Sequence, residues 1–346
     1  MSIRLLARSI AGFGLCVAAL SAFATSSPVS APYTGLVVFG DSLSDSGNNA
    51  ALLTQAYGGL PPVDITGDSF YSRLPSSAGT YSNGKVWTQY LAESLGLPLT
   101  PSVTPGGGNN FAFGGAQTGL DGNDVPAVPG FPFSMKTQLG QYLGATGNTA
   151  DPHALYIVAG GGNNVRAALE SIGAGADPVA TFAATVAGYA TDMAGMVAQL
   201  QQAGAQHVLV LNTPNFGLTP LAQSLQVSGL ATDLSFAMDQ KLAEALAGSG
   251  VKTFDMFSFM TGVVGAGAAS GFTNWTQACG AASNNCDVNT ALFWDGIHPT
   301  TLAHERLAQA VLATAVPEPA SVVLLVAGLG VVAASSRRRR AAVQQG

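Results

Sequence analysis

Four short runs rich in β-forming residues, three of them mainly apolar, most constrain what this chain can fold into. They lie at residues 36–39, 154–159, 207–212 and 251–254, and longer stretches with the apolar spacing of helices separate them. Continuous apolar strands that alternate with helices predict a parallel sheet covered on both faces, which is a three-layer α/β/α domain. The expected helices cover residues 85–97, 177–203, 219–247 in more than one piece, and 300–315.

Polar residues directly follow three of these strands. They are residues 40–42, 160–164 and 212–215. Because ligands bind beyond the carboxyl ends of the strands in open α/β sheets, the sequence predicts a site at this edge. Two long stretches rich in Gly, Pro, Asp and Ser, residues 58–83 and 119–133, are expected to be functional loops that shape the pocket.

Charge is scarce and unevenly distributed. Only 9% of the residues are charged, which suggests an exported protein, and the formal net charge is −6. Between residues 32 and 316 there are seven basic and 18 acidic side chains, a balance of −11. That balance argues against nucleic acid or an anionic lipid surface as the main partner.

The first 24 residues have the parts of a secretory signal peptide. Arg4 and Arg8 precede an apolar stretch, and Ala22-Phe23-Ala24 forms an A-x-A cleavage site. The alternative is a buried N-terminal helix.

The C-terminal end, residues 316–340, combines three features. Val-Pro-Glu-Pro is followed by an uncharged stretch at 320–336, 17 residues long, and by the cluster Arg337 to Arg340. This length is near the minimum for a transmembrane helix. The arginines would keep the C-terminal end of that helix in the cytoplasm, so the body of the protein would lie outside. Together they resemble the PEP-CTERM sorting signal of Gram-negative bacteria. The resemblance implies an exosortase as partner, cleavage near residues 317–319 and delivery to the cell envelope or the extracellular matrix. An ordinary C-terminal membrane anchor is the alternative.

Two cysteines remain after removal of a signal peptide. Cys279 and Cys286 are expected to form a disulfide in an exported protein, although two free thiols are the alternative. No His/Cys cluster suggests a metal site, and a Walker-like stretch at 79–86 has Val86 where the magnesium ligand belongs. We therefore expect neither a metal nor a cofactor.

A serine nucleophile needs a histidine base, and His298 is the best placed of the four histidines. It lies in the stretch W-D-G-I-H-P-T, between a turn and a helix start, with Asp295 three residues before it. The other three histidines lie next to predicted strands or inside the last helix, where structural or exposed positions are expected. The G-x-S-x-G motif of α/β-hydrolases is absent from the sequence.

Four blocks in order resemble the GDSL, or SGNH-hydrolase, family of esterases and lipases. They are G-D-S-L-S-D at residues 40–45, N-F-A-F-G-G at 110–115, G-G-N-N at 161–164 and D-G-I-H at 295–298. The segment Y-S-N-G-K-V-W at 81–87 also resembles one branch of the family. The resemblance implies a catalytic domain over residues 35–315, a flavodoxin-like sandwich with a mainly parallel five-stranded sheet.

The family resemblance also implies roles for single residues. Ser42 is the expected nucleophile, His298 its base and Asp295 the carboxylate that orients the imidazole. Ser42, Gly115 and Asn163 are the expected oxyanion hole. One departure is Asn164, which stands where the third block usually has Asp and puts loop rigidity and rate in doubt.

The expected function is hydrolysis of carboxylic esters, with a small-molecule or lipid ester as substrate. One alternative is a carbohydrate O-acetylesterase that acts on acetylated exopolysaccharide. Another is a surface-matrix protein that keeps the fold but catalyses weakly or not at all.

Overall fold

A computed structural model of the chain describes residues 32–316. The predicted signal peptide, residues 1–24, and the predicted membrane span, residues 320–336, lie outside the described residues. Between residues 32 and 316, no helix has the length and apolar character needed to cross a membrane.

The central sheet is parallel throughout. It consists of β1 (Leu36–Gly40), β2 (Leu155–Ala159), β3 (His207–Leu211) and β4 (Lys252–Phe254), in the order β1-β2-β3-β4. Residues in register include Val38 with Ile157 and Ile157 with Leu209. All four strands lie where the apolar runs predicted them.

The expectation of a five-stranded sheet was wrong for the described residues. The segment at residues 109–113 lies where a fifth strand would stand, beside β1, and forms backbone hydrogen bonds with Val38 and Gly40 at 2.7 to 3.2 Å. It is not a regular strand, because the Asn110 side chain accepts the Ala112 N–H at 2.9 Å. A side chain that bonds its own backbone competes with a strand ladder.

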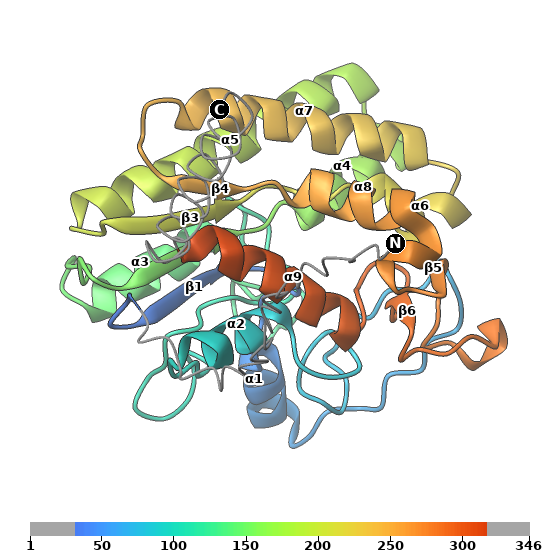
Figure 1. Cartoon of the computed structure of the whole chain (residues 1–346), viewed down its shortest axis with the longest axis horizontal. Helices are drawn as coiled ribbons and strands as arrows, with labels where there is room; N and C mark the ends of the chain where they lie inside the picture. Colours follow the sequence, from blue (N-terminus) through green and yellow to red (C-terminus); the bar gives the residue numbers. More distant parts are fainter. Residues whose placement is uncertain (1–31, 317–346) are drawn as a thin grey trace, which may run out of the picture.

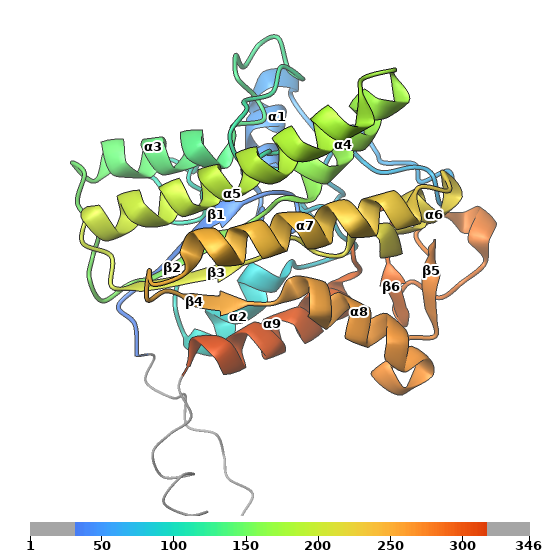
Figure 2. The ribbon, with the colours of Figure 1, turned by 90° about the horizontal axis from the view of Figure 1, so that it is seen from above.

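Helices cover both faces of the sheet, as Figures 1 and 2 show. One face packs against α3 (Met135–Ala145), α4 (Gly162–Gly173), α5 (Pro178–Gln202) and α7 (Ser228–Leu246). The other packs against α2 (Trp87–Leu95), α8 (Met256–Ala266) and α9 (Thr301–Ala315). Alternate residues of each strand pack into the hydrophobic cores on the two faces of the sheet. Phe39 and Val158 lie in the core beneath α5 and α7, and Val38 and Ile157 lie in the core beneath α2 and α9. This is the predicted three-layer sandwich.

Local signals explain the helix boundaries. Asp177 begins α5, because its carboxylate accepts the Ala180 N–H at 2.7 Å and Pro178 occupies the first helical position. The predicted helical region at 219–247 divides into α6 (Pro220–Ser224) and α7. The shorter elements are α1 (Asn48–Tyr57), the 3₁₀ turns η1 (Phe216–Leu218), η2 (Gly267–Ser270) and η3 (Ala282–Asn284), and a small parallel pair, β5 (Asn274–Ala278) and β6 (Ala291–Phe293).

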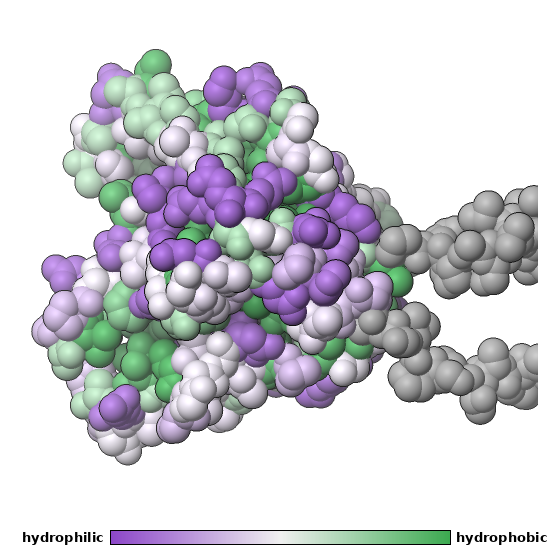
Figure 3. Space-filling model, turned by 90° about the vertical axis from the view of Figure 1, so that its left-hand side faces the viewer, coloured by the Kyte–Doolittle hydropathy of each residue, from purple (hydrophilic) through white to green (hydrophobic). Residues whose placement is uncertain are grey.

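Both ends of the described chain meet where the strands begin. Tyr33 donates its hydroxyl hydrogen to the Ala315 carbonyl at 2.6 Å, and Lys252 Nζ donates to the Thr314 and Ala315 carbonyls at 3.1 and 3.0 Å. The strands begin on the left-hand side of Figure 1, the side that Figure 3 shows face on. Hydrophilic residues cross the middle of this face and hydrophobic ones gather near its lower corner.

Candidate active site

Ser42 lies in a tight turn directly after β1. The N–H groups of Ser44 and Asp45 donate to the Asp41 carbonyl, each at 3.0 Å, and the Leu43 N–H donates to the Asp41 carboxylate at 3.0 Å. Asp41 is buried, and burial raises its pKa to about 6. The turn aims Ser42 into a cleft at the carboxyl end of the sheet.

His298 and Asp295 come from the turn between β6 and α9. Asp295 Oδ1 accepts the Ile297 and His298 N–H groups at 2.9 and 2.7 Å, and its Oδ2 lies 2.8 Å from His298 Nδ1. His298 Nε2 lies 2.9 Å from Ser42 Oγ. A carboxylate beside Nδ1 holds the proton there, so Nε2 is free to accept the serine hydrogen.

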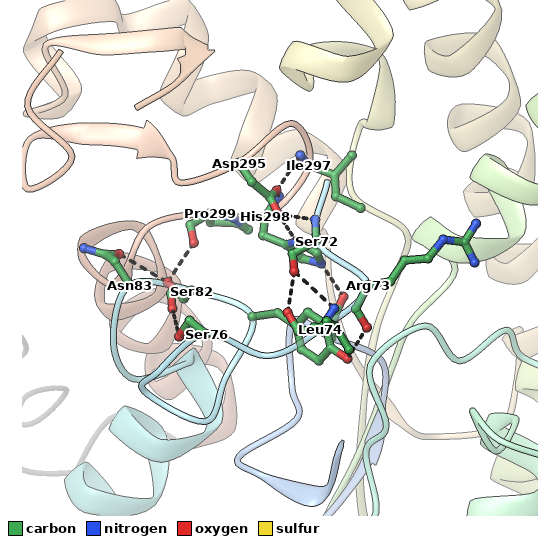
Figure 4. A network of polar contacts seen from close by, with 12 residues as sticks. Ser72, Arg73, Leu74, Ser76, Ser82, Asn83, Asp295, Ile297, His298 and Pro299 are labelled. Atoms are coloured by element: carbon green, nitrogen blue, oxygen red, sulfur yellow. Dashed lines mark hydrogen bonds and ion pairs between the residues drawn. The ribbon is translucent and has the colours of Figure 1, made fainter. Parts of the chain in front are cut away.

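A long loop completes this arrangement. The Ser72 N–H donates to Asp295 Oδ2 at 2.8 Å, and Ser82 donates to the Pro299 carbonyl at 2.9 Å (Figure 4). The Tyr81 ring packs 5.2 Å from the His298 ring. The sequence reasoning missed the contribution of Ser72, because a backbone donor carries no side-chain signal. It singled out the segment of Tyr81 but assigned that side chain no role.

Gly115 and Asn163 line the same cleft as Ser42 and His298. Gly115 has a φ of +87°, a conformation that favours glycine. The N–H groups of Ser42 and Gly115 donate to no acceptor within residues 32–316. Asn163 Nδ2 donates one hydrogen to the Ala116 carbonyl at 3.0 Å and keeps its second hydrogen. Gly115 and Asn163 line the same cleft as Ser42, and all three residues keep hydrogen-bond donors without an acceptor among residues 32–316.

Asn164 ties α4 to the turn that carries Gly115. Its Oδ1 accepts the Thr118 N–H at 3.1 Å and its Nδ2 donates to Thr118 Oγ1 at 3.0 Å. Thr118 Oγ1 in turn donates to Asp192 Oδ2 at 3.0 Å. The amide thus makes two hydrogen bonds to this turn, although the family pattern has a carboxylate here.

Asp45 organises the rest of the first block. Its carboxylate accepts the N–H groups of Gly47, Asn48, Asn49 and Gly114 at 2.7 to 3.2 Å. Burial raises the pKa of Asp45 to about 6, although the four hydrogen bonds by themselves would lower it. Asn48 and Asn49, to which the sequence assigned no role, extend these links with side-chain amides that bond carbonyl groups of the 110–115 segment.

Two cavities open beside Ser42, Asn163 and His298. One is a cleft of about 150 Å³ whose wall combines charged side chains, such as Arg73, Asp124 and Arg166, with apolar ones, such as Leu74 and Phe131. The other, of about 40 Å³, is mostly apolar, with Leu43, Pro214, Phe216, Met260, Ile297 and Pro299 in its wall. Charged side chains therefore line the larger cavity and not the smaller one, except for Asp41 and the histidine of the site.

Cys279 and Cys286 form a disulfide with their Cα atoms 5.3 Å apart. It closes the loop between β5 and β6, just before the turn of Asp295. Among residues 32–316, no group of three or more His, Cys, Asp or Glu side chains could hold a metal ion.

Comparison with known families gives two matches. The family model described as GDSL-like lipase/acylhydrolase matches residues 36–311. The model described as PEP-CTERM protein-sorting motif matches residues 315–340.

Individual relatives are more distant. The chain is 31% identical to Lipase 1 of Photorhabdus luminescens over 206 residues, 59% of this chain but only 26% of that protein. It is 27% identical to a GDSL esterase/lipase of Arabidopsis thaliana over 82% of this chain and 90% of that one. Similar solved structures include a lipase/acylhydrolase from Enterococcus faecalis (12% identity, TM-score 0.43, 80% of this chain and 93% of that one). Another is an acetylxylan esterase from Geobacillus stearothermophilus (12% identity, TM-score 0.45, 84% and 98%).

Proposed function

The chain belongs to the GDSL-like lipase/acylhydrolase family, and we propose from its site that it is an exported serine hydrolase of carboxylic esters. The observation that carries the proposal is the pairing of two arrangements around Ser42. The first is the hydrogen-bonded series Ser42, His298, Asp295, and the second is a group of three donors in the same cleft without a full set of acceptors.

Acylation begins at Ser42. Its Oγ attacks the ester carbonyl carbon while His298 Nε2 takes the hydroxyl proton, and Asp295 stabilises the imidazolium that forms. Collapse of the tetrahedral intermediate breaks the bond to the alcohol oxygen, which takes the proton back from His298. In the second half, His298 activates a water molecule that hydrolyses the acyl-enzyme and regenerates Ser42.

The negative charge of each tetrahedral intermediate falls on the former carbonyl oxygen. The N–H groups of Ser42 and Gly115 and the spare hydrogen of Asn163 Nδ2 are the proposed oxyanion hole. Because these groups are fixed before the reaction, they stabilise the charge without reorganisation, and losing one such donor typically costs about 10²–10³ in turnover.

The two cavities favour short acyl groups on polar alcohols. The apolar cavity of about 40 Å³ has room for a small acyl chain, and the cleft of about 150 Å³ offers Arg73, Asp124 and Arg166 as partners for a hydroxylated leaving group beside its apolar wall. This difference supports a second candidate function, a carbohydrate O-acetylesterase. A series of p-nitrophenyl esters from acetate to laurate, measured beside an acetylated polysaccharide, separates it from a lipase.

Export is the second part of the proposal. The PEP-CTERM motif indicates export in Gram-negative bacteria and association with the cell envelope. We propose that the signal peptide at residues 1–24 directs passage through the inner membrane. We also propose that residues 320–336 hold the chain in that membrane until an exosortase cleaves near residues 317–319.

A fluorophosphonate probe tests the catalytic proposal directly. We expect it to label the folded protein at Ser42, and Ser42→Ala to lose both labelling and hydrolysis of p-nitrophenyl acetate. Ser46→Ala is the matched control, because Ser46 lies in the same turn and only accepts a hydrogen bond from Asn110, at 2.9 Å. Absence of labelling in a folded protein would favour a matrix protein without catalysis.

A further inference from the structure

The amide of Asn163 is held in one orientation by two partners. Its Nδ2 donates to the Ala116 carbonyl at 3.0 Å, and its Oδ1 accepts from Arg166 Nη2 at 3.3 Å. Since amide nitrogen and oxygen have nearly the same shape, only hydrogen-bond partners decide which one faces a given side. The Ala116 carbonyl can only accept and the Arg166 guanidinium can only donate. Both partners therefore favour the orientation in which Nδ2 faces the turn of Gly115.

Arg166 is itself fixed at both ends of its guanidinium. It lies on α4, three residues after Asn163, and its side chain is only 13% exposed. Nη1 donates to Glu170 Oε1 at 2.8 Å and to Tyr71 Oη at 3.1 Å. The guanidinium also lies 5.1 Å from the centre of the Tyr71 ring. Arg166 therefore connects α4, the long loop of Tyr71 and the amide of Asn163.

We propose that Arg166 is a positioning residue for the oxyanion hole and acts through Asn163. The inference rests on the proposed function, because Asn163 matters for rate only if Ser42 reacts with esters. A cation that binds the amide oxygen keeps Nδ2 in place and polarises the amide, so its N–H becomes a stronger donor. The planar fork reaches Asn163, Tyr71 and Glu170 at once, and a lysine ammonium does not reproduce that geometry.

Arg73 is the matched control. It lines the same cleft, its Nη2 donates to the same Tyr71 hydroxyl at 3.1 Å, and its guanidinium lies 5.7 Å from the same ring. Its other charged partner is Asp124, at 3.5 Å, and it forms no hydrogen bond with Asn163. A role in substrate binding would be shared by both arginines, whereas a role through Asn163 belongs to Arg166 alone.

A double-mutant cycle tests the proposal. Arg166→Gln and Asn163→Ala are made singly and together, and kcat and KM are measured on p-nitrophenyl acetate. We expect Arg166→Gln to lower kcat about 10- to 100-fold, within the loss known for a whole oxyanion donor, with little change in KM. With Asn163→Ala already present, the same substitution should change kcat by less than about 3-fold, because residues that act as a unit are not additive. Arg73→Gln should change kcat/KM by the same factor in both backgrounds.

Equal losses from Arg166→Gln with and without Asn163 would overturn the inference while leaving the proposed function intact. If Arg166→Gln does not fold, Arg166→Lys keeps the charge and the aliphatic stem and should still lose most of the effect. Thermal unfolding of each variant and its rate of labelling by the fluorophosphonate probe provide readouts besides turnover. A folded wild-type protein that neither labels nor hydrolyses esters would instead refute the proposed function, and the inference with it.

Discussion

Asp295→Asn should leave the fold in place and remove most of the activity. The substitution exchanges one carboxylate oxygen for an NH₂ group. If the amide oxygen takes the place of Oδ1, it still accepts the Ile297 and His298 N–H groups. The amide nitrogen then replaces Oδ2, where two donors point at 2.8 Å: the Ser72 N–H and His298 Nδ1.

The structure decides between the two orientations of that amide. The flipped form would set its NH₂ against two backbone donors and would leave both without an acceptor. The first form leaves only the buried Ser72 N–H unpaired, at a cost of about 1–3 kcal/mol, so it is preferred. In that form His298 Nδ1 must accept from the amide, which places the imidazole proton on Nε2, facing Ser42 Oγ at 2.9 Å.

With a proton on Nε2, His298 no longer accepts the serine hydrogen. We expect kcat to fall by about 10⁴, the loss measured when the carboxylate of another serine triad becomes an amide. Turnover of p-nitrophenyl acetate between pH 6 and 9 gives the rate, and chemical unfolding gives the stability. Asp124→Asn, a carboxylate in the same cleft without contact to His298, should affect KM more than kcat. A folded Asp295→Asn variant with kcat within tenfold of wild type would refute the tautomer argument.

Three further predictions follow from the packing and the buried polar groups. Gly114→Ala should destabilise the fold by about 1–3 kcal/mol or more and lower kcat, because a Cβ there would lie 2.0 Å from the buried Tyr81 ring that packs on His298. Gly140→Ala in α3, with open space around it, should instead stabilise by about 0.5–1 kcal/mol, and equal melting shifts for the two would contradict this. Asp239, whose pKa burial raises to about 8, stays protonated in the fold at pH values where the unfolded chain ionises. The folded state therefore holds the extra proton, and stability should fall as the pH rises from about 4 to 8. Asp239→Asn should flatten that dependence in urea unfolding at pH 5, 7 and 9, and an unchanged slope would exclude the carboxyl as its source. Asn164→Asp should cost about 1–3 kcal/mol, because Thr118 already donates its hydroxyl hydrogen to Asp192, and the cost should shrink when Asp192→Asn is present.

The sequence was sufficient to predict the strands, the main helices and the layers. The strands β1, β2 and β3 are short, mainly apolar runs because both faces of the sheet are buried there, and this pattern is local, whereas β4 (Lys-Thr-Phe) is a more exposed edge strand. The candidate residues Gly115, Asn163 and His298 were also predictable as a set from the four sequence blocks, since Gly115 and His298 lie in loops near the sheet edge and Asn163 lies in the first turn of α4, which follows β2. The structure adds the 2.9 Å contact between His298 Nε2 and Ser42 Oγ, and it places Gly115 and Asn163 in the wall of the same cleft.

Contacts between distant segments were not predictable. Ser72 meets Asp295 only because a loop without regular structure crosses the turn before α9, and its N–H would act the same with another side chain. The fifth strand was expected from the family and is replaced by the segment of Asn110, where side-chain amides compete with the ladder. The hydrogen bond from Arg166 to Asn163 joins two residues three positions apart on α4. In the sequence, such a pair cannot be distinguished from two polar residues on an exposed helix face.

The hydrogen bond between Tyr33 and Ala315 has a consequence for how the enzyme would meet its substrate. Helix α9 starts next to His298 and ends at Ala315, so its 15 residues separate the sorting tail from the cleft by about 22 Å. Both ends of the described chain therefore lie at the edge of the sheet where the strands begin, and Ser42 lies at the opposite edge, after the end of β1. If the proposed anchor at residues 320–336 holds the chain in a membrane, the cleft would face away from that membrane. Polymers in the surrounding medium would then reach Ser42 more readily than the lipids of that same membrane.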